Sequence, residues 1–177
     1  TEATIFPSTA LLRSCAIHWF IIVLSYLVCH KESHWKIMVT WAKENAVASG
    51  LGDAPIRWLV DDCVKFVERE IRRGNHYDAI IMDPPSYGRG PKGEIWKIED
   101  AIHPLIKLCT KILSDDPLFF LVNSYTTGLA PAVLTYMLAT ELKPWKGNVE
   151  SQEIGLPVTE SGLVLPCGAS GRWSSSR

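Results

Sequence analysis

Glycine is absent from the first 36 residues of this 177-residue chain, although twelve glycines follow later. A segment without glycine offers no tight turn at which its backbone could approach a phosphate group closely. The whole sequence also lacks a GxGxxG motif and any acid–base set for hydride transfer. These absences argue against a nicotinamide-dependent dehydrogenase.

The sequence has neither a large excess of one charge nor a pair of closely spaced cysteines. Lysine and arginine number 18 against 19 acidic residues, so no global basic field indicates nucleic acid, although a local patch stays compatible with an RNA partner. The five cysteines are scattered without a CxxC pair, at Cys15, Cys29, Cys63, Cys109 and Cys167. We expect reduced thiols in an intracellular protein, with neither a disulfide framework nor a metal site.

Residues 1–36 differ from the rest of the chain because one apolar run dominates them. Ser14 to Cys29 is nearly all apolar, and extending the run back to residue 11 gives about the length of a membrane span, with one arginine inside it. One interpretation is a membrane-associated anchor formed by residues 11–29. The other is a core strand or helix of a cytoplasmic protein, which the shortness of the charge-free run favours.

From residue 37 onward, helix-spaced and continuous apolar runs alternate along the chain. They predict helices over 37–48, 63–73, 100–113 and 128–142, and strands over 57–60, 77–82, 117–122, 149–156 and 162–166. Asp61 or Asp62 is expected to cap the second helix, and Gly74 to end it. The pattern predicts an α/β fold with a Rossmann-like, doubly wound, mostly parallel sheet. The last two strands lack an intervening helix, which predicts an antiparallel terminal hairpin.

The sequence is organised around a short apolar run that ends on an acid. Ala79 to Met82 has the pattern of a strand covered on both faces, and Asp83 follows directly. Pro84 and Pro85 then prevent further strand pairing because neither has a backbone N–H. We expect a carboxylate held at the carboxyl end of a central strand, where open α/β sheets bind ligands. An ordinary strand-to-loop turn is the alternative.

Polar residues also follow two other predicted strands, Asp61 and Asp62 after one and residues 123–125 after the other. At this edge Asp83 can accept a hydrogen bond from an amino or ring N–H, and the Pro84 carbonyl can accept another. An aromatic side chain, Tyr87, is available to stack on a base. Methyl transfer from a sulfonium requires little more, because the donor is already activated and the protein supplies alignment and charge stabilisation.

The DPPSY sequence at 83–87 resembles the fourth motif of class I S-adenosylmethionine-dependent methyltransferases that modify nucleic-acid nitrogen. Longer blocks resemble bacterial-type large-subunit rRNA methyltransferases: DPPSYGRGPKGEIW at 83–96, NSYTTGL at 123–129 and GLPVTESGLVLPCGASGRW at 155–173. This resemblance covers about residues 38–173. It implies S-adenosyl-L-methionine as the cofactor, RNA as the substrate, and a methyltransferase-like catalytic domain over 37–177 that follows an atypical segment, 1–36.

The resemblance also assigns roles to single residues. It implies a catalytic and target-binding set made of Asp83, Pro84, Pro85, Ser86 and Tyr87. It places the adenine of the cofactor beside Asp62 and Cys63, with Asp83 bordering the same site. Where the family has a ribose-binding acid, this sequence offers only Glu32 as a weak substitute.

The Gly-rich turn of the family has no counterpart in residues 1–36. We therefore expect a fold that is incomplete at the N-terminus and a weakened cofactor site. Our hypothesis is that this segment is replaced, alternatively spliced or mistranslated, and that a genuine methyltransferase portion begins near Met38.

Methylation of a base nitrogen is favoured over methylation of a pyrimidine carbon. No cysteine nucleophile lies in the DPPSY motif or in residues 123–125, and Cys167 is expected in the core. Three basic residues near the motif, Arg89, Lys92 and Lys97, are candidates for phosphate contacts, with a solvated loop as the alternative. The alternative function is a catalytically impaired remnant that acts as a binding module, soluble or membrane-tethered.

Overall fold

The computed structural model describes residues 20–23, 32–89, 93–126 and 128–176. These residues form two compact units. The first contains residues 32–60, and the second contains residues 20–23 together with the described residues from 61 onward.

The first unit consists of helix α2 (Glu32–Ala48) and the extended chain that follows it. Gly50 adopts a left-handed conformation just after the helix, as expected of a residue that ends one. The strand predicted at 57–60 is wrong, because these residues pair with no other strand in the described part of the chain. Their β-branched and aromatic side chains favour extended backbone, but a strand also requires a neighbouring strand. The domain boundary predicted at residue 36 falls inside α2 and stays a prediction.

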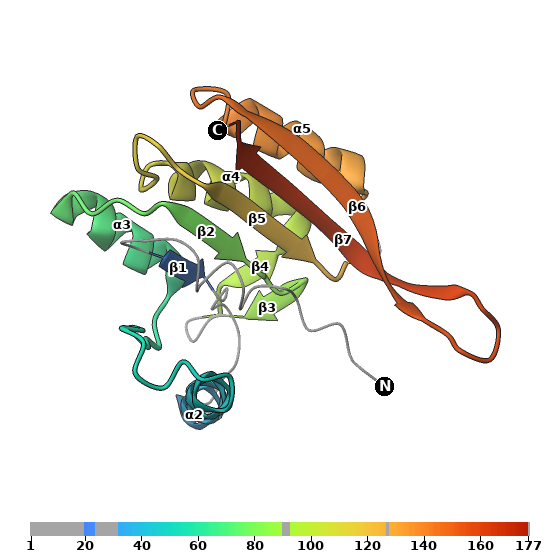
Figure 1. Cartoon of the computed structure of the whole chain (residues 1–177). Helices are drawn as coiled ribbons and strands as arrows, with labels where there is room; N and C mark the ends of the chain where they lie inside the picture. The colour runs from blue at the N-terminus through green and yellow to red at the C-terminus, as the bar shows by residue number, and fades with distance from the viewer. Residues whose placement is uncertain (1–19, 24–31, 90–92, 127, 177) are drawn as a thin grey trace. The chain divides into compact units, whose positions relative to one another are not determined.

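The second unit is built on a five-stranded mixed sheet in the order β1-β2-β5-β7-β6 (Figure 1). Its strands are β1 (Phe20–Val23), β2 (Ala79–Met82), β5 (Phe119–Ser124), β6 (Gly147–Pro157) and β7 (Val164–Ser175). The pairs β1–β2 and β2–β5 are parallel, whereas β5–β7 and β6–β7 are antiparallel. This arrangement confirms the α/β prediction and its antiparallel terminal hairpin.

Strand β1 lies within the apolar run that has two interpretations. Its four residues pair with β2, which matches the interpretation of part of this run as a strand of the domain. The other residues of 11–29 lie outside the described part of the chain. Among the described residues, no helix is both long and apolar enough to cross a membrane.

Three helices pack against this sheet: α3 (Cys63–Arg73), α4 (Ile98–Thr110) and α5 (Pro131–Glu141). Helix α4 contacts both of the others, and α5 lies against β6 and β7. The side chains between sheet and helices form one core cluster, which includes Val67, Ile80, Ile102, Phe120, Val122 and Leu138. Local signals explain α3 well. Asp62 caps its start by accepting from Lys65 N, and Gly74 ends it at a φ of 69°.

Strand β7 extends well beyond the predicted 162–166, to Ser175. Its second half is rich in glycine and serine, a composition typical of loops. Pairing on both sides, with β5 and β6, makes it a strand. Packing requires glycine at position 171 of this strand, because a Cβ there would lie 2.9 Å from Leu134 Cβ on α5.

A buried acid connects the end of α3 to the start of β2. Glu70 has no exposed surface, and its carboxylate accepts hydrogen bonds from Tyr77 Oη, Asn75 Nδ2 at 2.7 Å and Arg73 Nη1 at 2.8 Å. Burial pushes the pKa of Glu70 upward, but the three donors together outweigh burial and hold the pKa below its ordinary value. The ionised form therefore stabilises the fold.

We predict that Glu70→Gln lowers the free energy of unfolding by about 1.5–3 kcal/mol at pH 7, because charge-assisted hydrogen bonds are lost. Because the folded-state pKa of Glu70 is depressed, its contribution is fully present above about pH 4.3 and is lost as the pH falls through the folded-state value. Urea titrations at several pH values measure this. Glu68→Gln, at an exposed position of the same helix, is the control. A pH-independent difference between wild type and Glu70→Gln would contradict the prediction.

Candidate functional site

The candidate site forms where β2 and β5 end at the same edge of the sheet. Met82 pairs with Val122, so Asp83 follows β2 at the level where Asn123 continues β5. Asn123 and Ser124 are buried, and Asn123 Oδ1 accepts a hydrogen bond from Ser170 Oγ at 2.9 Å. The predicted convergence of Asp83 with residues 123–125 is thus present in the structure.

The Asp83 carboxylate is half-buried, and no described residue donates a hydrogen bond to it. Burial alone raises the pKa of Asp83 above its ordinary value. Burial, followed by the neighbouring Asp83 and Cys167, also raises the pKa of Tyr125. Asp83 and Cys167 therefore both lie near the Tyr125 hydroxyl. Cys167 is partly exposed, not in the core as expected.

A short hairpin fixes the loop after Asp83. It consists of β3 (Tyr87–Arg89) and β4 (Ile95–Lys97), which pair antiparallel. Trp96 Nε1 donates to the Pro85 carbonyl at 2.8 Å, and Ile98 N donates to the Ser86 carbonyl at 3.1 Å. For the Pro84 carbonyl, no donor is found among the residues that the structure describes. The hairpin thus occupies two successive carbonyls, whereas the carbonyl of Pro84, a buried residue, accepts no hydrogen bond from the described residues.

The Ser86 hydroxyl joins the two strand-end loops, because it accepts a hydrogen bond from Thr126 Oγ1 at 2.6 Å. The next residue, Tyr87, is half exposed, and its hydroxyl accepts from Arg89 Nε at 3.0 Å. Ser86 and Tyr87 also border an open cavity of about 480 Å³ whose other lining residues are Lys97, Glu99 and Asp100. The cavity thus combines a half-exposed aromatic residue with one lysine and two acidic residues.

A close backbone contact closes the other side of the site. Gly168 adopts a φ of 155°, and a Cβ there would lie 1.9 Å from Ser124 O and 2.8 Å from Tyr125 Cα. Only glycine permits this approach of β7 to the end of β5. Gly168 therefore holds the backbone that carries Tyr125.

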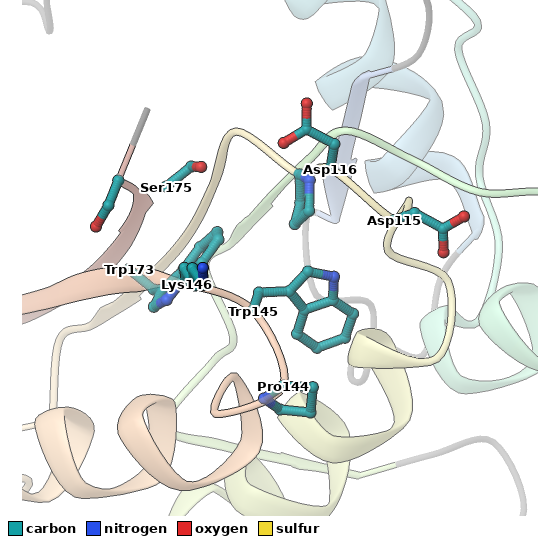
Figure 2. A pocket seen from close by; sticks show the side chains of 9 residues that line it. Asp115, Asp116, Pro144, Trp145, Lys146, Trp173 and Ser175 are labelled. Carbon is teal, nitrogen blue, oxygen red and sulfur yellow. The ribbon is translucent and has the colours of Figure 1, made fainter.

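A second cavity, of about 290 Å³, lies at the opposite end of β5. Figure 2 shows its lining, with the Trp145 indole between Asp115 and Pro144. Trp145 Nε1 donates to the Ser114 carbonyl at 3.1 Å. None of the predicted site residues borders this cavity.

The predicted cofactor residues are placed less completely. Asp62 and Cys63 begin α3, and because α3 runs back to the start of β2, they lie toward the edge where β2 ends. The Asp62 carboxylate accepts from Lys65 N at 3.2 Å and pairs with Lys65 Nζ at 3.4 Å, so it retains accepting capacity. The Cys63 side chain is buried in the core. Glu32 begins α2 in the other unit, and its side chain is outside the described residues.

Three further residues shape the site without a local sequence signal that predicts their roles: Trp96, Thr126 and Gly168. Trp96 and Gly168 contact backbone atoms of residues distant in sequence. Thr126 donates its hydrogen bond to the Ser86 hydroxyl, forty residues away. Lys92 lies outside the described residues. Across the described parts of the chain, no group of three or more His, Cys, Asp or Glu side chains is arranged to hold a metal ion.

Comparison with known proteins confirms the resemblance to S-adenosylmethionine-dependent methyltransferases. The chain is 35% identical to the SAM-dependent methyltransferase from Agrobacterium tumefaciens, with a TM-score of 0.69 over 78% of this chain and 46% of that structure. It is 27% identical over 85 residues to ribosomal RNA large subunit methyltransferase K of Neisseria meningitidis serogroup B, covering 48% of this chain and 24% of that protein. No family model matches the chain.

A third comparison concerns the fold alone. A structure described as a methyltransferase complexed with S-adenosylhomocysteine superposes with a TM-score of 0.54 at 17% identity, over 75% of this chain and 36% of that structure. The chain thus spans less than half the length of each of these proteins. The α/β fold of the second unit is that of S-adenosylmethionine-dependent methyltransferases.

We predict that Gly168→Ala lowers the free energy of unfolding by about 2–4 kcal/mol, because the new Cβ clashes with the backbone of β5. Gly128→Ala is the matched control, since a Cβ there meets no atom within 4 Å. Urea denaturation of both variants measures the difference. Equal stability of the two variants would show that β7 does not approach β5 as described.

Proposed function

We propose that the second unit is the acceptor-binding part of an S-adenosylmethionine-dependent methyltransferase that modifies a base nitrogen in RNA. One observation carries this proposal: the Asp83 carboxylate and the Pro84 carbonyl are adjacent acceptors without a donor among the described residues. A base amino group has two N–H donors that match such a pair. The similarity to named methyltransferases supports the reaction class.

Asp83 and the Pro84 carbonyl act by positioning and by electrostatics. Two accepted hydrogen bonds orient the amino nitrogen and direct its lone pair toward the methyl donor. As the nitrogen lone pair forms the new N–C bond, the bond from the methyl group to sulfur breaks and its electron pair stays on sulfur, so positive charge moves to the nitrogen. The fixed Asp83 carboxylate stabilises that charge and accepts the proton that the nitrogen releases. Ser86 and Thr126 support this geometry by joining the two loops. Tyr87, with its exposed ring, supplies a surface on which the base stacks.

S-adenosyl-L-methionine supplies an activated methyl group when it is bound. Two of the described residues would hold part of it: the Asp62 carboxylate would accept a hydrogen bond from the adenine amino group, and the backbone at Cys63 would border the ring. Cys63 contributes no side-chain contact, because its thiol is buried. Glu32 remains a proposed ribose ligand, on sequence grounds alone.

RNA is the proposed substrate, and ribosomal RNA the proposed class, because one relative is named for methylation of the large ribosomal subunit RNA. Arg89 and Lys97 lie in the hairpin next to Ser86 and Tyr87, where they meet backbone phosphates. The proposed location is the cytoplasm, where ribosomal RNA is available.

The second candidate function is a binding module without catalysis. The absence of glycine from residues 1–36 favours it, because those residues supply no Gly-rich turn for the cofactor. The acceptor side would then bind RNA without methylating it.

Asp83→Ala is expected to lower kcat/KM for methyl transfer to unmodified large-subunit rRNA by about 10²–10³-fold, because a stabiliser of transition-state charge is lost. Transfer of labelled methyl groups from S-adenosylmethionine measures this. The control is Asp115→Asn, an exposed acid at the opposite end of β5. Equal activity of the Asp83 variant and the control would exclude Asp83 from the reaction.

The same role predicts a pH profile. Only the ionised Asp83 carboxylate stabilises the positive charge that develops on the nitrogen, so wild-type kcat/KM rises with pH through the raised pKa of Asp83. Asp83→Asn loses that ascending limb. The Asp83→Asn variant is expected to be as stable as the wild type at neutral pH. Burial disfavours the negative charge of Asp83, and asparagine has no charge at this position. A profile shared by wild type and Asp83→Asn would assign the limb to another group.

Isothermal titration separates the two candidate functions. We expect S-adenosylmethionine to bind with a Kd above about 100 μM, because part of its site has no counterpart in residues 1–36. Asp62→Asn, which keeps a good helix cap, is expected to weaken binding about tenfold further. A low-micromolar Kd would contradict the hypothesis that the cofactor site is incomplete. No binding at millimolar S-adenosylmethionine would favour the function as a binding module.

A further inference from the structure

The terminal hairpin extends beyond the sheet as a two-stranded arm. We define the arm as residues 155–166. Strand β7 pairs with β5 only from Ala169 onward, so in the described structure the strands of the arm pair only with each other. Figure 1 shows this ribbon projecting past the end of β5. Its turn is closed by hydrogen bonds from Val158 N to Leu163 O and from Gly162 N to Val158 O.

The arm is apolar on both faces, which is unusual for a ribbon in water. Leu156 lies opposite Leu165, so these two side chains share one face. Pro157 lies opposite Val164 on the other face, and Val164 covers Gly155 there. Leu156, Val164 and Leu165 are 56–60% exposed, and Leu163 in the turn is 69% exposed. Two-stranded ribbons are marginal alone, so two apolar faces require two covering surfaces.

The charge of the hairpin argues against nucleic acid as the covering partner. Residues 147–175 carry three glutamates and one arginine, with no lysine or histidine, and the single charged residue of the arm is Glu160. A polyanion gains nothing from such a surface, because phosphate binding depends on basic residues. The partner is therefore an apolar protein surface.

We propose that the arm mediates a two-fold dimer of this chain by reciprocal arm exchange. In such a dimer the Leu156–Leu165 face packs on the same face of the partner's arm, and the Val164 face packs on the partner's body. A two-fold contact is self-complementary, so each chain contributes the same surfaces to the interface. The two kinds of contact together cover both apolar faces of both arms.

The size of the arm fits this arrangement. Three strand rungs and the turn make a ribbon about 20 Å long and 10 Å wide, or about 200 Å² per face. The contact between the two arms then buries about 400 Å², and the two contacts of an arm with the partner's body bury about 800 Å². The total of roughly 1,200 Å² is at the lower bound of a standard stable interface.

The test is the mass of the full chain between about 1 and 100 μM, measured by sedimentation velocity and light scattering. The expected mass is twice the 19.8 kDa of one chain. Leu156→Ser with Leu165→Ser is expected to raise the dimer Kd at least ~100-fold, and Val164→Ser to raise it as well, since each removes one apolar face. These side chains are exposed, so circular dichroism should show that both variants fold.

Tyr136→Ser is the matched control, because Tyr136 is 71% exposed on α5, away from the arm, and should leave the dimer intact. A wild-type mass of one chain at 100 μM would overturn the proposal, as would growth past two chains without a plateau. A dimer that survives the double substitution would also overturn it. If the wild type is monomeric and the double substitution weakens binding of an rRNA fragment more than tenfold, the arm contacts RNA instead.

Discussion

The parallel register between β2 and β5 is the constraint on which the candidate site depends. Because Met82 pairs with Val122, the residues that follow each strand emerge at one level of the same edge. A shift by one residue would turn every side chain of β2 to the opposite face and bury Asp83 differently. The core side chains Ile80 and Phe120 fix this register, since both must face the helices. Packing far from the edge thus positions the acid.

Much of this arrangement follows from local sequence signals, and the rest follows from contacts between distant segments. The Asp62 cap, the glycine end of α3 and the proline-terminated strand β2 were each predictable from neighbouring residues. The strand predicted at 57–60 failed because pattern alone supplies no partner strand. Conversely, the second half of β7 has a loop-like composition and becomes a strand through pairing on both sides. Pairing is the property that a single sequence conceals.

The same division holds within the site. The sequence pattern identified Asp83 as a carboxylate at a strand end, which needed only the apolar run and the two prolines. It did not reveal that Trp96 and Ile98 occupy the carbonyls of Pro85 and Ser86. That arrangement matters because the preceding carbonyl, that of Pro84, is then the one of the three without a donor among the described residues. Specific acceptor geometry therefore comes from the hairpin, whose contacts no local rule predicts.

Two acids of the second unit illustrate what distinguishes a structural carboxylate from a binding one. Glu70 is fully buried and receives three donors, so its pKa is depressed and its charge stabilises the fold. Asp83 is half-buried and receives none from the described residues, so its pKa is raised and its charge opposes folding. The second unit thus supplies hydrogen-bond donors to the Glu70 carboxylate, whereas its described residues supply none to the Asp83 carboxylate at the edge of the sheet. An acid and an adjacent carbonyl that receive no donor from the described residues gain stabilisation from a ligand that brings N–H groups, which is the property that an amine-binding site requires.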